Sequence, residues 1–186
     1  MNQRIPGTVL QLPDKDAAHV EALFGSMFLA GGMMLGQVSA ITGLEPYTVQ
    51  NWVKRGFLSP PENKRYTLRQ LCRIININML KAALPMEDIC GLLRYINGQL
   101  DNEQDDLIDD SRLYFLFVKL ALDYRQIRQG ADLDAYLDQA LSDYQEPVPG
   151  AKEQVKKVLR VMLTAWAAAQ LRQTAENMIR ELKEQT

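Results

Sequence analysis

The sequence predicts an all-α protein that contains at most one small hairpin. Most segments place apolar residues three or four positions apart, which is the spacing of one face of a helix. Glycines and prolines interrupt these segments where helices of ordinary length would begin or end. Residues 57–66 contain "SPPENK", which cannot be helical, and are expected to form the hairpin. A chain of 186 residues, of which 47% are hydrophobic, can bury a real core.

Residues 1–32 are expected to form a tail that ends at Pro13 and a helix from Asp14 to about Leu29. The glycines of "AGG" end this helix. The apolar run "ALFGSMFLAGGMMLG" (22–36) is too short to span a membrane and follows acidic rather than basic residues. We therefore expect a buried helix and a loop, with no membrane anchor and no secretion signal.

Residues 33–98 are predicted to form a unit of four short helices. The first stops at Gly43, and Pro46 suits the first turn of the second. Thr67 is followed three residues later by Gln70, which is the capping-box spacing that opens a third helix. The four helices are expected at 36–43, at about 46–55, from 67 to near 84, and from 85 onward.

Residues 99–110 are expected to form a solvated acidic linker. Six acidic residues and no basic residue lie between Asp101 and Asp110. Their spacing is not that of a calcium-binding loop, so a cation site is the less favoured interpretation.

Residues 111–186 are predicted to form a helical dimerisation or effector region. Its first helix, 111–128, is apolar on almost every side and should be central, either as plain core or as the wall of a ligand pocket. A shorter helix at about 132–144 and the linker "QEPVPG" follow. The long helix 151–184 fits either a dimer seam or packing within its own chain. Its broad apolar stripe comprises Val155, Val158, Leu159, Met162, Trp166, Ala169, Met178, Ile179 and Leu182.

The second of the four short helices predicted within residues 33–98, at about 46–55, has two contrasting faces. At about 100° per residue, Val49, Trp52 and Val53 share one arc, which would anchor the helix to the core. Long polar and basic side chains occupy the other face, as a DNA recognition helix requires. The hairpin that follows would add a basic wing against phosphate. The candidate DNA-binding residues are therefore Tyr47, Thr48, Gln50, Asn51, Lys54, Arg55, Lys64, Arg65 and Tyr66.

Charge is distributed unevenly along the chain. The net charge is −2, yet seven basic residues and two acidic residues lie between Glu45 and Lys81. This local excess suits nucleic acid, although a polar outer face is also what any surface helix shows. Trp52 remains open between core packing and DNA contact.

The stretch "LGQVSAITGLEPYTVQNWVKRGFLSPPENKRYTLRQLCRIININMLKAALPMEDICGLL" resembles the MerR-type winged helix-turn-helix domain, over roughly residues 33–98. The opening of its first helix, the Gly56-Phe57-Leu58 step before the wing and "LPMEDI" carry the resemblance. The family has an arginine where this chain has Gln50. The wing of this chain is shorter than the wing of the family. "VQNWVKRGFL" is closer to an uncharacterised bacterial branch, a domain of unknown function. The resemblance implies a winged helix that binds DNA.

The other reactive side chains do not form a recognisable catalytic or metal-binding pattern. His19 is the only histidine, and Cys72 and Cys90 are too far from it in sequence to give metal-ligand spacing. The two cysteines suit buried small residues better than a redox switch, in a reduced compartment. No phosphate loop, nucleophile elbow or paired-carboxylate signature occurs. We therefore expect no enzyme activity, no cofactor and no metal.

Two functions of different classes remain open. The first is a cytoplasmic bacterial transcriptional regulator that binds double-stranded DNA sequence-specifically, as a homodimer on a palindromic site. An unknown small molecule or protein would be its effector. The second is a protein-interaction module with a MerR-like fold that modulates a partner protein, which Gln50 and the acidic net charge favour.

Overall fold

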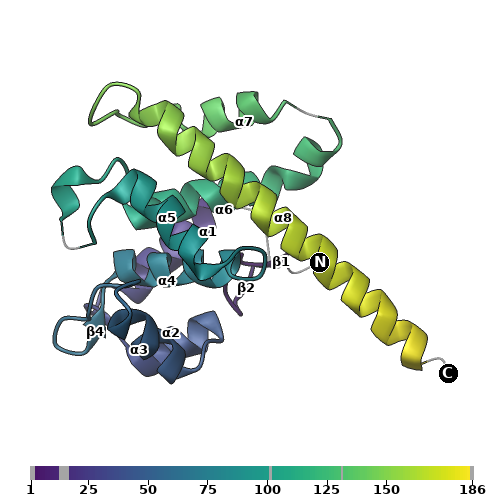
Figure 1. Ribbon diagram of the computed structural model, residues 1–186, viewed down its shortest axis with the longest axis horizontal. Helices are drawn as coiled ribbons and strands as arrows, with labels where there is room; N and C mark the ends of the chain where they lie inside the picture. The colour runs from purple at the N-terminus through teal and green to yellow at the C-terminus, as the bar shows by residue number, and fades with distance from the viewer. Residues whose placement is uncertain (1–2, 13–16, 101, 131, 185–186) are drawn as a thin grey trace.

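The computed structural model describes residues 3–12, 17–100, 102–130 and 132–184. It is mostly helical, as predicted (Figure 1). In chain order the elements are β1 (Gln3–Arg4), β2 (Gln11–Leu12), α1 (Ala17–Met27), β3 (Met33–Met34), α2 (Leu35–Thr42), α3 (Pro46–Lys54), β4 (Arg65–Tyr66), α4 (Leu68–Leu80), α5 (Met86–Asn97), the 3-10 turn η1 (Glu103–Asp105), α6 (Asp110–Arg128), α7 (Leu133–Ala140) and α8 (Ala151–Glu184).

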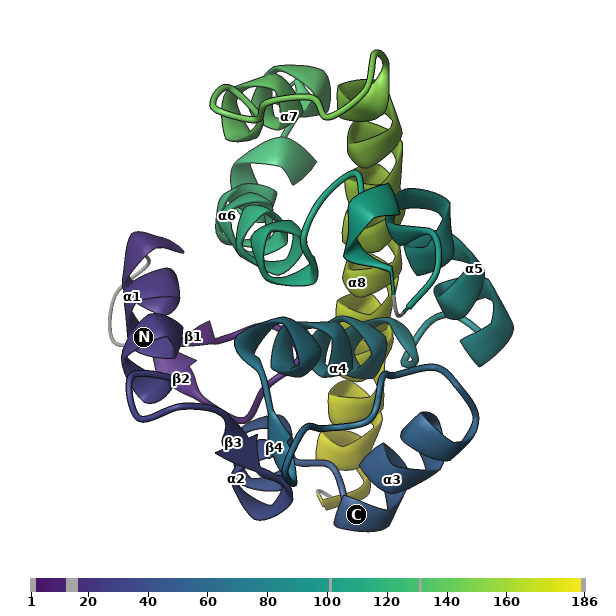
Figure 2. The same cartoon turned by 90° about the vertical axis from the view of Figure 1, so that its left-hand side faces the viewer.

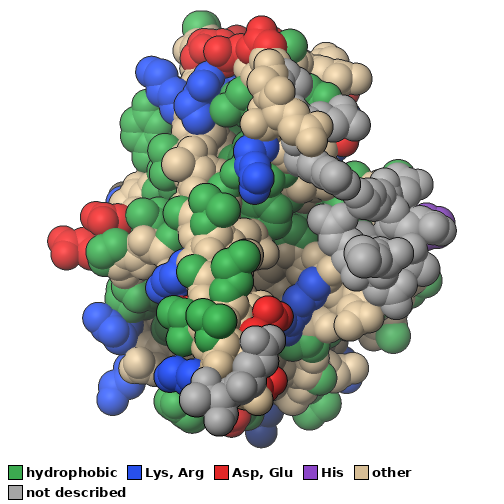
Figure 3. Space-filling view, turned by 90° about the vertical axis from the view of Figure 1, so that its right-hand side faces the viewer, with side chains coloured by type: hydrophobic (Ala, Val, Ile, Leu, Met, Phe, Trp, Pro, Cys, Tyr) green, Lys and Arg blue, Asp and Glu red, His purple; other side chains and the backbone are tan. Residues whose placement is uncertain are grey.

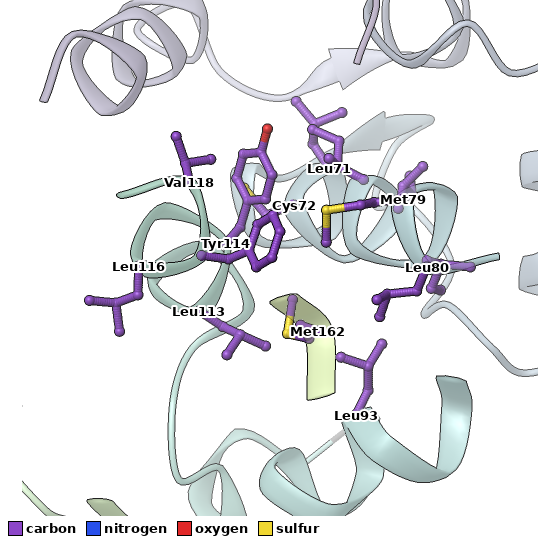
Figure 4. Packing of buried hydrophobic residues seen from close by; sticks show 14 of the residues in the cluster. Leu71, Cys72, Met79, Leu80, Leu93, Leu113, Tyr114, Leu116, Val118 and Met162 are labelled. Atoms are coloured by element: carbon purple, nitrogen blue, oxygen red, sulfur yellow. The ribbon is translucent and has the colours of Figure 1, made fainter. Parts of the chain in front are cut away.

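Helix α6 lies at the centre of the fold, which confirms the prediction made from its apolar sequence. It packs against α1, α4, α7 and α8, so that apolar residues on several of its sides become buried. Leu113, Tyr114 and Phe117 are all fully buried. Figure 4 shows side chains of α4, α5, α6 and α8 meeting around Met162. Most of the segment is therefore core. Phe115 and Leu116 of the same helix also line a cavity of about 630 Å³ beside α1, so the ligand-pocket alternative stays a prediction.

The N-terminal residues form a packed hairpin that the sequence did not predict. β1 pairs antiparallel with β2, and Ile5 between them is fully buried. The hydroxyl of Tyr114 donates to the carbonyl oxygen of Pro6 at 2.9 Å. The Asn78 amide donates to the carbonyl oxygens of Gly7 and Thr42, each at 3.0 Å. The expectations of a tail and of at most one hairpin were wrong, because two-residue strands leave no periodic pattern.

Helix α1 spans much of the predicted N-terminal helix, with Val20 and Phe24 buried on its inner side. The predicted tail end at Pro13 and helix start at Asp14 lie outside the described residues. The second small sheet pairs β3 with β4 and so ties the residues before α2 to those before α4. Figure 2 shows this sheet beside α2, with α4 above it and α6 beyond.

Helix α8 divides into two parts with different surroundings. Val155, Leu159 and Met162 are fully buried, so packing within the chain is correct for the first part. From Gln170 to Glu184 every described residue is exposed, and this part projects from the body towards the C-terminus (Figure 1). The predicted stripe thus leaves the core before it reaches Met178.

Replacing Tyr114 by Phe should lower the free energy of unfolding by about 1–2 kcal/mol, because the Pro6 carbonyl would lose its buried donor. Tyr95→Phe is the matched control, since Tyr95 is 52% exposed. Chemical denaturation of both variants measures the difference. Equal stability of Tyr114→Phe and the control would show that this hydrogen bond does not hold the hairpin.

Candidate nucleic-acid interface

Helices α2 and α3 pack against each other through a short turn. Gly43 ends α2 in the left-handed conformation at φ 71°, and its N–H donates to the Ser39 carbonyl at 2.8 Å. Pro46 opens α3, where its missing N–H costs nothing. Leu44 is buried in the turn between them. The glycine stop and proline start thus set α3 at a fixed angle to α2, as predicted.

The polar face of α3 is exposed and its apolar face is buried. Trp52 is only 5% exposed, which settles its role as core packing, and the Lys81 Nζ lies 5.6 Å from its ring centroid. Tyr47 is 70% exposed, and the Arg55 guanidinium lies 4.6 Å from the ring centroid of Phe57. Of the predicted residues on or beside this face, Thr48 is half-buried, whereas Tyr47, Gln50, Asn51, Lys54 and Arg55 are exposed.

The turn before α4 presents Lys64 beside α3. The N–H of Arg65 donates to the Glu62 carbonyl at 2.8 Å and closes a tight turn. Asn63 and Lys64, its central residues, have φ of 47° and 64°, the left-handed pair that such hairpin turns need. A left-handed conformation costs a lysine about 1–2 kcal/mol relative to its ordinary backbone. Lys64 is exposed at the tip of this turn.

Arg65 and Tyr66 differ from the prediction because both belong to β4. The Arg65 Nη1 donates to the Gly32 carbonyl at 2.7 Å, so its guanidinium already serves the β3–β4 connection. Tyr66 pairs with Met33 and is only 3% exposed. The alternation of β4 turns the Tyr66 ring into the core, which leaves little of its surface for the predicted contact with DNA.

Two of the arginines that made this region basic are neutralised within the fold. Arg69 forms an ion pair with Asp106, and the Arg73 Nη1 lies 3.2 Å from Asp110. Arg73 also donates through Nε to the Phe57 carbonyl at 3.1 Å. Asp106 and Asp110 are buried by these contacts. The expectation that the acidic segment 99–110 is solvated along its whole length was therefore wrong. Its boundaries as a linker stay a prediction.

Burial raises the pKa of Asp106 to about 6, and the nearby Arg69 only partly offsets this effect. One carboxylate oxygen, Oδ1, has no hydrogen-bond partner among the described residues. The pKa of Asp110 is also raised by burial, against the lowering effect of Arg73. The pKa of the Cys72 thiol is raised well above its usual range by burial, then by Asp109 and Asp110. A protonated, buried thiol matches the structural interpretation of Cys72 and not a redox switch.

An apolar groove of about 450 Å³ lies between α3 and the turn at Lys64. Its walls include Leu35, Val53 and Pro61, and Gln50 also lines it. The exposed Met34 side chain stands at its edge. Sequence patterns did not reveal this groove, because its walls come from three separate segments. It is the one apolar feature of an otherwise polar interface in the described part of the chain.

Other candidate chemistry is sparse in the residues that the structure describes. His19 lies exposed on α1. Among the described residues, no three His, Cys, Asp or Glu side chains are grouped closely enough to hold a metal ion. None of the helices in the described ranges is both long and apolar enough to cross a membrane.

Part of the chain is similar to a family of unknown function. Residues 33–117 match the family model "Domain of unknown function (DUF1836)". An uncharacterized protein, YkrK of Bacillus subtilis (strain 168), is 29% identical over 84 residues, which cover 43% of this chain and 36% of that protein. No solved structure matches significantly. The predicted similarity to a domain of unknown function is confirmed, and the matched region includes the beginning of α6 with Asp110.

Replacing Asp106 by Asn should flatten the pH dependence of stability between about pH 4 and 6. The folded-state pKa of about 6 exceeds the ordinary 3.8, so the folded protein binds this proton more tightly than the unfolded chain. The group therefore lowers the free energy of unfolding as pH rises through this window, by at most about 3 kcal/mol.

Urea unfolding at several pH values measures this slope. Asp123→Asn is the matched control, because it removes a carboxylate from α6 about 20 Å along the helix from Asp110. If the free energy of unfolding falls as steeply with pH in Asp106→Asn as in the control variant, Asp106 does not carry the raised pKa.

Proposed function

We propose that residues 33–98 form a winged helix of the MerR type that binds double-stranded DNA sequence-specifically. One observation carries this proposal: α3 exposes a continuous polar face beside the turn at Lys64. Lys54 and Lys64 make no ion pair with any other described residue. Two exposed cations on neighbouring segments, with exposed amide side chains on the same helix as Lys54, suit the phosphates and base edges of a duplex.

The dimensions of α3 support insertion into the major groove. An α-helix with its side chains is about 10–12 Å across, and the major groove is about 12 Å wide. Gln50 and Asn51 can each pair with an adenine edge through two hydrogen bonds. Lys54 at the end of the helix would reach a guanine or a phosphate. In this arrangement the side chains of α3 read sequence, and the Lys64 turn contacts the backbone.

The backbone of Lys64 supports a role for its side chain. Glycine adopts a left-handed φ at little steric cost, whereas lysine does not. A charged side chain held at such a position is an outlier of the kind that clusters at functional sites. Contact between its ammonium group and a DNA phosphate would offset the backbone cost.

We further propose that the protein is a transcriptional regulator of the bacterial cytoplasm and acts by binding rather than by catalysis. A two-fold dimer would present two copies of α3 to successive major grooves of a palindromic site. Gln50 stands where the MerR type has an arginine, so its preferred bases are expected to differ from those of that type.

Substitutions at Lys54 and Lys64 should weaken DNA binding at all sequences. Lys54→Ala and Lys64→Gly should each reduce the slope of log binding constant against log salt by about 0.9, because each removes one phosphate contact. Glycine is chosen at position 64 because it keeps the left-handed turn. Fluorescence anisotropy at several salt concentrations, with a site selected from genomic DNA, measures this slope.

Lys157→Ala on α8 is the matched control, because it removes an exposed lysine on another part of the molecule. Slopes that neither interface variant changes would exclude this face as the DNA-binding surface. Absence of any saturable DNA retention by the wild-type protein would exclude the function itself.

The groove beside α3 favours a second candidate function, recognition of a partner protein. Its apolar walls could receive one large apolar side chain, next to the hydrogen-bonding groups of Gln50. Met34→Ser would remove the apolar edge without changing charge. Loss of a co-purifying partner in this variant, with no DNA retained by the wild type, would favour protein recognition. An unchanged salt slope in Met34→Ser, with DNA retained, would favour the regulator.

A further inference from the structure

A separate cavity of about 430 Å³ lies between the chain that leaves α3 and the helix α5. Its walls include Phe57 after α3, Cys90 and Arg94 of α5, and Gly98 and Leu100 beyond that helix. No acidic side chain lines it in the part of the chain that the structure describes. Figure 2 shows α5 and the chain leaving α3 on the same side of α4. Its volume is that of a small-molecule site, and we call it the α5 cavity.

Three guanidinium groups lie close to the Cys90 thiol at the wall of the α5 cavity. Burial raises the pKa of this thiol, whereas Arg73, Arg94 and Arg55 lower it, an effect that needs charges close by. Cys90 and Arg94 share one face of α5, because they are four residues apart. The Arg55 guanidinium lies over the ring of Phe57, 4.6 Å from its centroid. Positive charge from three segments of the chain therefore converges on this cavity.

Two of these three arginines have no acidic partner among the described residues. Arg73 is neutralised by its buried ion pair, described above. Arg55 and Arg94 are both exposed, and neither forms an ion pair with any other residue that the structure describes. The carboxylate of Asp105 accepts a hydrogen bond from the N–H of Gln99 at 3.1 Å and does not pair with either arginine. The α5 cavity is therefore bordered by two guanidinium groups whose charge is not balanced.

Basic side chains on other parts of the molecule are spread out or paired. Figure 3 shows the side from which α8 projects, where lysines and arginines form separate patches. Between α7 and α8, Lys156 pairs with Asp138 and Arg160 pairs with Asp134. Arginines that converge on one cavity without an acidic counterpart are therefore a local feature, and an anionic ligand would neutralise them.

The charge of the α5 cavity indicates which anion fits. A guanidinium group matches both phosphate and carboxylate through two parallel hydrogen bonds. A phosphate monoester carries a charge of about −1.5 to −2 at neutral pH and can neutralise both Arg55 and Arg94, whereas one carboxylate neutralises only one of them. A phosphate of duplex DNA carries a single charge and is joined to a sugar on both sides, which suits an open surface better than a cavity. The monoester of a small molecule therefore fits best.

We propose that the α5 cavity binds a small molecule with a phosphate monoester group, which Arg94 and Arg55 hold through charged hydrogen bonds. The organic part of this ligand would lie against Phe57 and Leu100. Binding needs no DNA, and the inference therefore does not rest on the proposed function. Arg55 also belongs to the predicted DNA-binding residues, whereas Arg94 does not. Arg94 is therefore the residue at which the two proposals can be tested apart.

Alkylation of Cys90 by iodoacetamide, in the full chain and without DNA, reports whether the cavity is occupied. Cys72 is fully buried and serves as the internal control, because it should not react while the protein stays folded. The probe is phenyl phosphate. At about ten times its Kd, this probe should slow the alkylation of Cys90 about tenfold, because only the free protein reacts. Peptide mass spectrometry measures the rates, and sodium chloride at matched ionic strength should change them little.

Arg94→Gln should raise the Kd of phenyl phosphate by roughly tenfold or more, because it removes one of the two unbalanced guanidinium groups. Arg94→Lys should give an intermediate Kd, since lysine keeps the charge without the planar fork. Arg172→Gln is the matched control, because it removes an exposed arginine from the projecting part of α8 and should leave the Kd unchanged. Thermal unfolding should show that each variant keeps the stability of the wild type.

An alkylation rate that phenyl phosphate leaves unchanged in the wild type would overturn the proposal. Equal protection of Cys90 by benzoate, which carries one charge and no phosphate, would also overturn it. The same holds for protection by a short DNA duplex alone, which would place a backbone phosphate in the cavity. Protection by phenyl phosphate in a protein that retains no DNA would support the α5 cavity and count against the proposed function alone.

Discussion

The packing of α4 against α6 is the contact on which the rest of the structure depends. Both helices bury apolar side chains there, and the buried ion pair between Arg73 and Asp110 lies beside them. Removing one partner of such a pair costs about 3–5 kcal/mol, because the other charge is left buried alone. Arg73 also binds the Phe57 carbonyl, directly after α3. The same side chain therefore holds α6 to α4 and fixes the chain that leaves the candidate interface.

The candidate interface is rigid because its segments are tied to this pair of helices. The Gln70 side chain closes the capping box of α4 and donates to the Ser59 and Pro60 carbonyls. β4 pairs with β3 immediately before α2, so the Lys64 turn and the start of α2 share one sheet. Side chains that read a base edge must be held within fractions of an ångström, which rigid elements achieve better than loops. Sequence-specific binding of DNA and binding of a single side chain of a partner protein both need such support.

Local chemistry made much of the helical framework predictable from the sequence. Gly43, Pro46 and the pair Thr67 and Gln70 act within three or four residues, and each ends or begins a helix as expected. The division of α3 into a polar and an apolar face was predictable from the helical period of its sequence. The burial of Tyr66 was not predictable, because the direction of its side chain depends on pairing with Met33, a residue far away in sequence. The burial of Asp106 likewise depends on Arg69, 37 residues earlier. A hint was present, since Arg69 and Arg73 share the four-residue spacing of Asp106 and Asp110.

The N-terminal hairpin has a consequence for how the chain acquires its structure. Its Pro6 carbonyl binds the Tyr114 hydroxyl across 108 residues, and its Gly7 carbonyl shares the Asn78 amide with the last residue of α2. Contacts between residues so distant in sequence form late, since the entropy of closing the intervening loop must be overcome first. During synthesis α2 and α3 emerge long before α6 does. The residues of the candidate interface are therefore synthesised before the part of the core that holds them in place. A nascent chain that stops before Tyr114 contains the interface residues without that core.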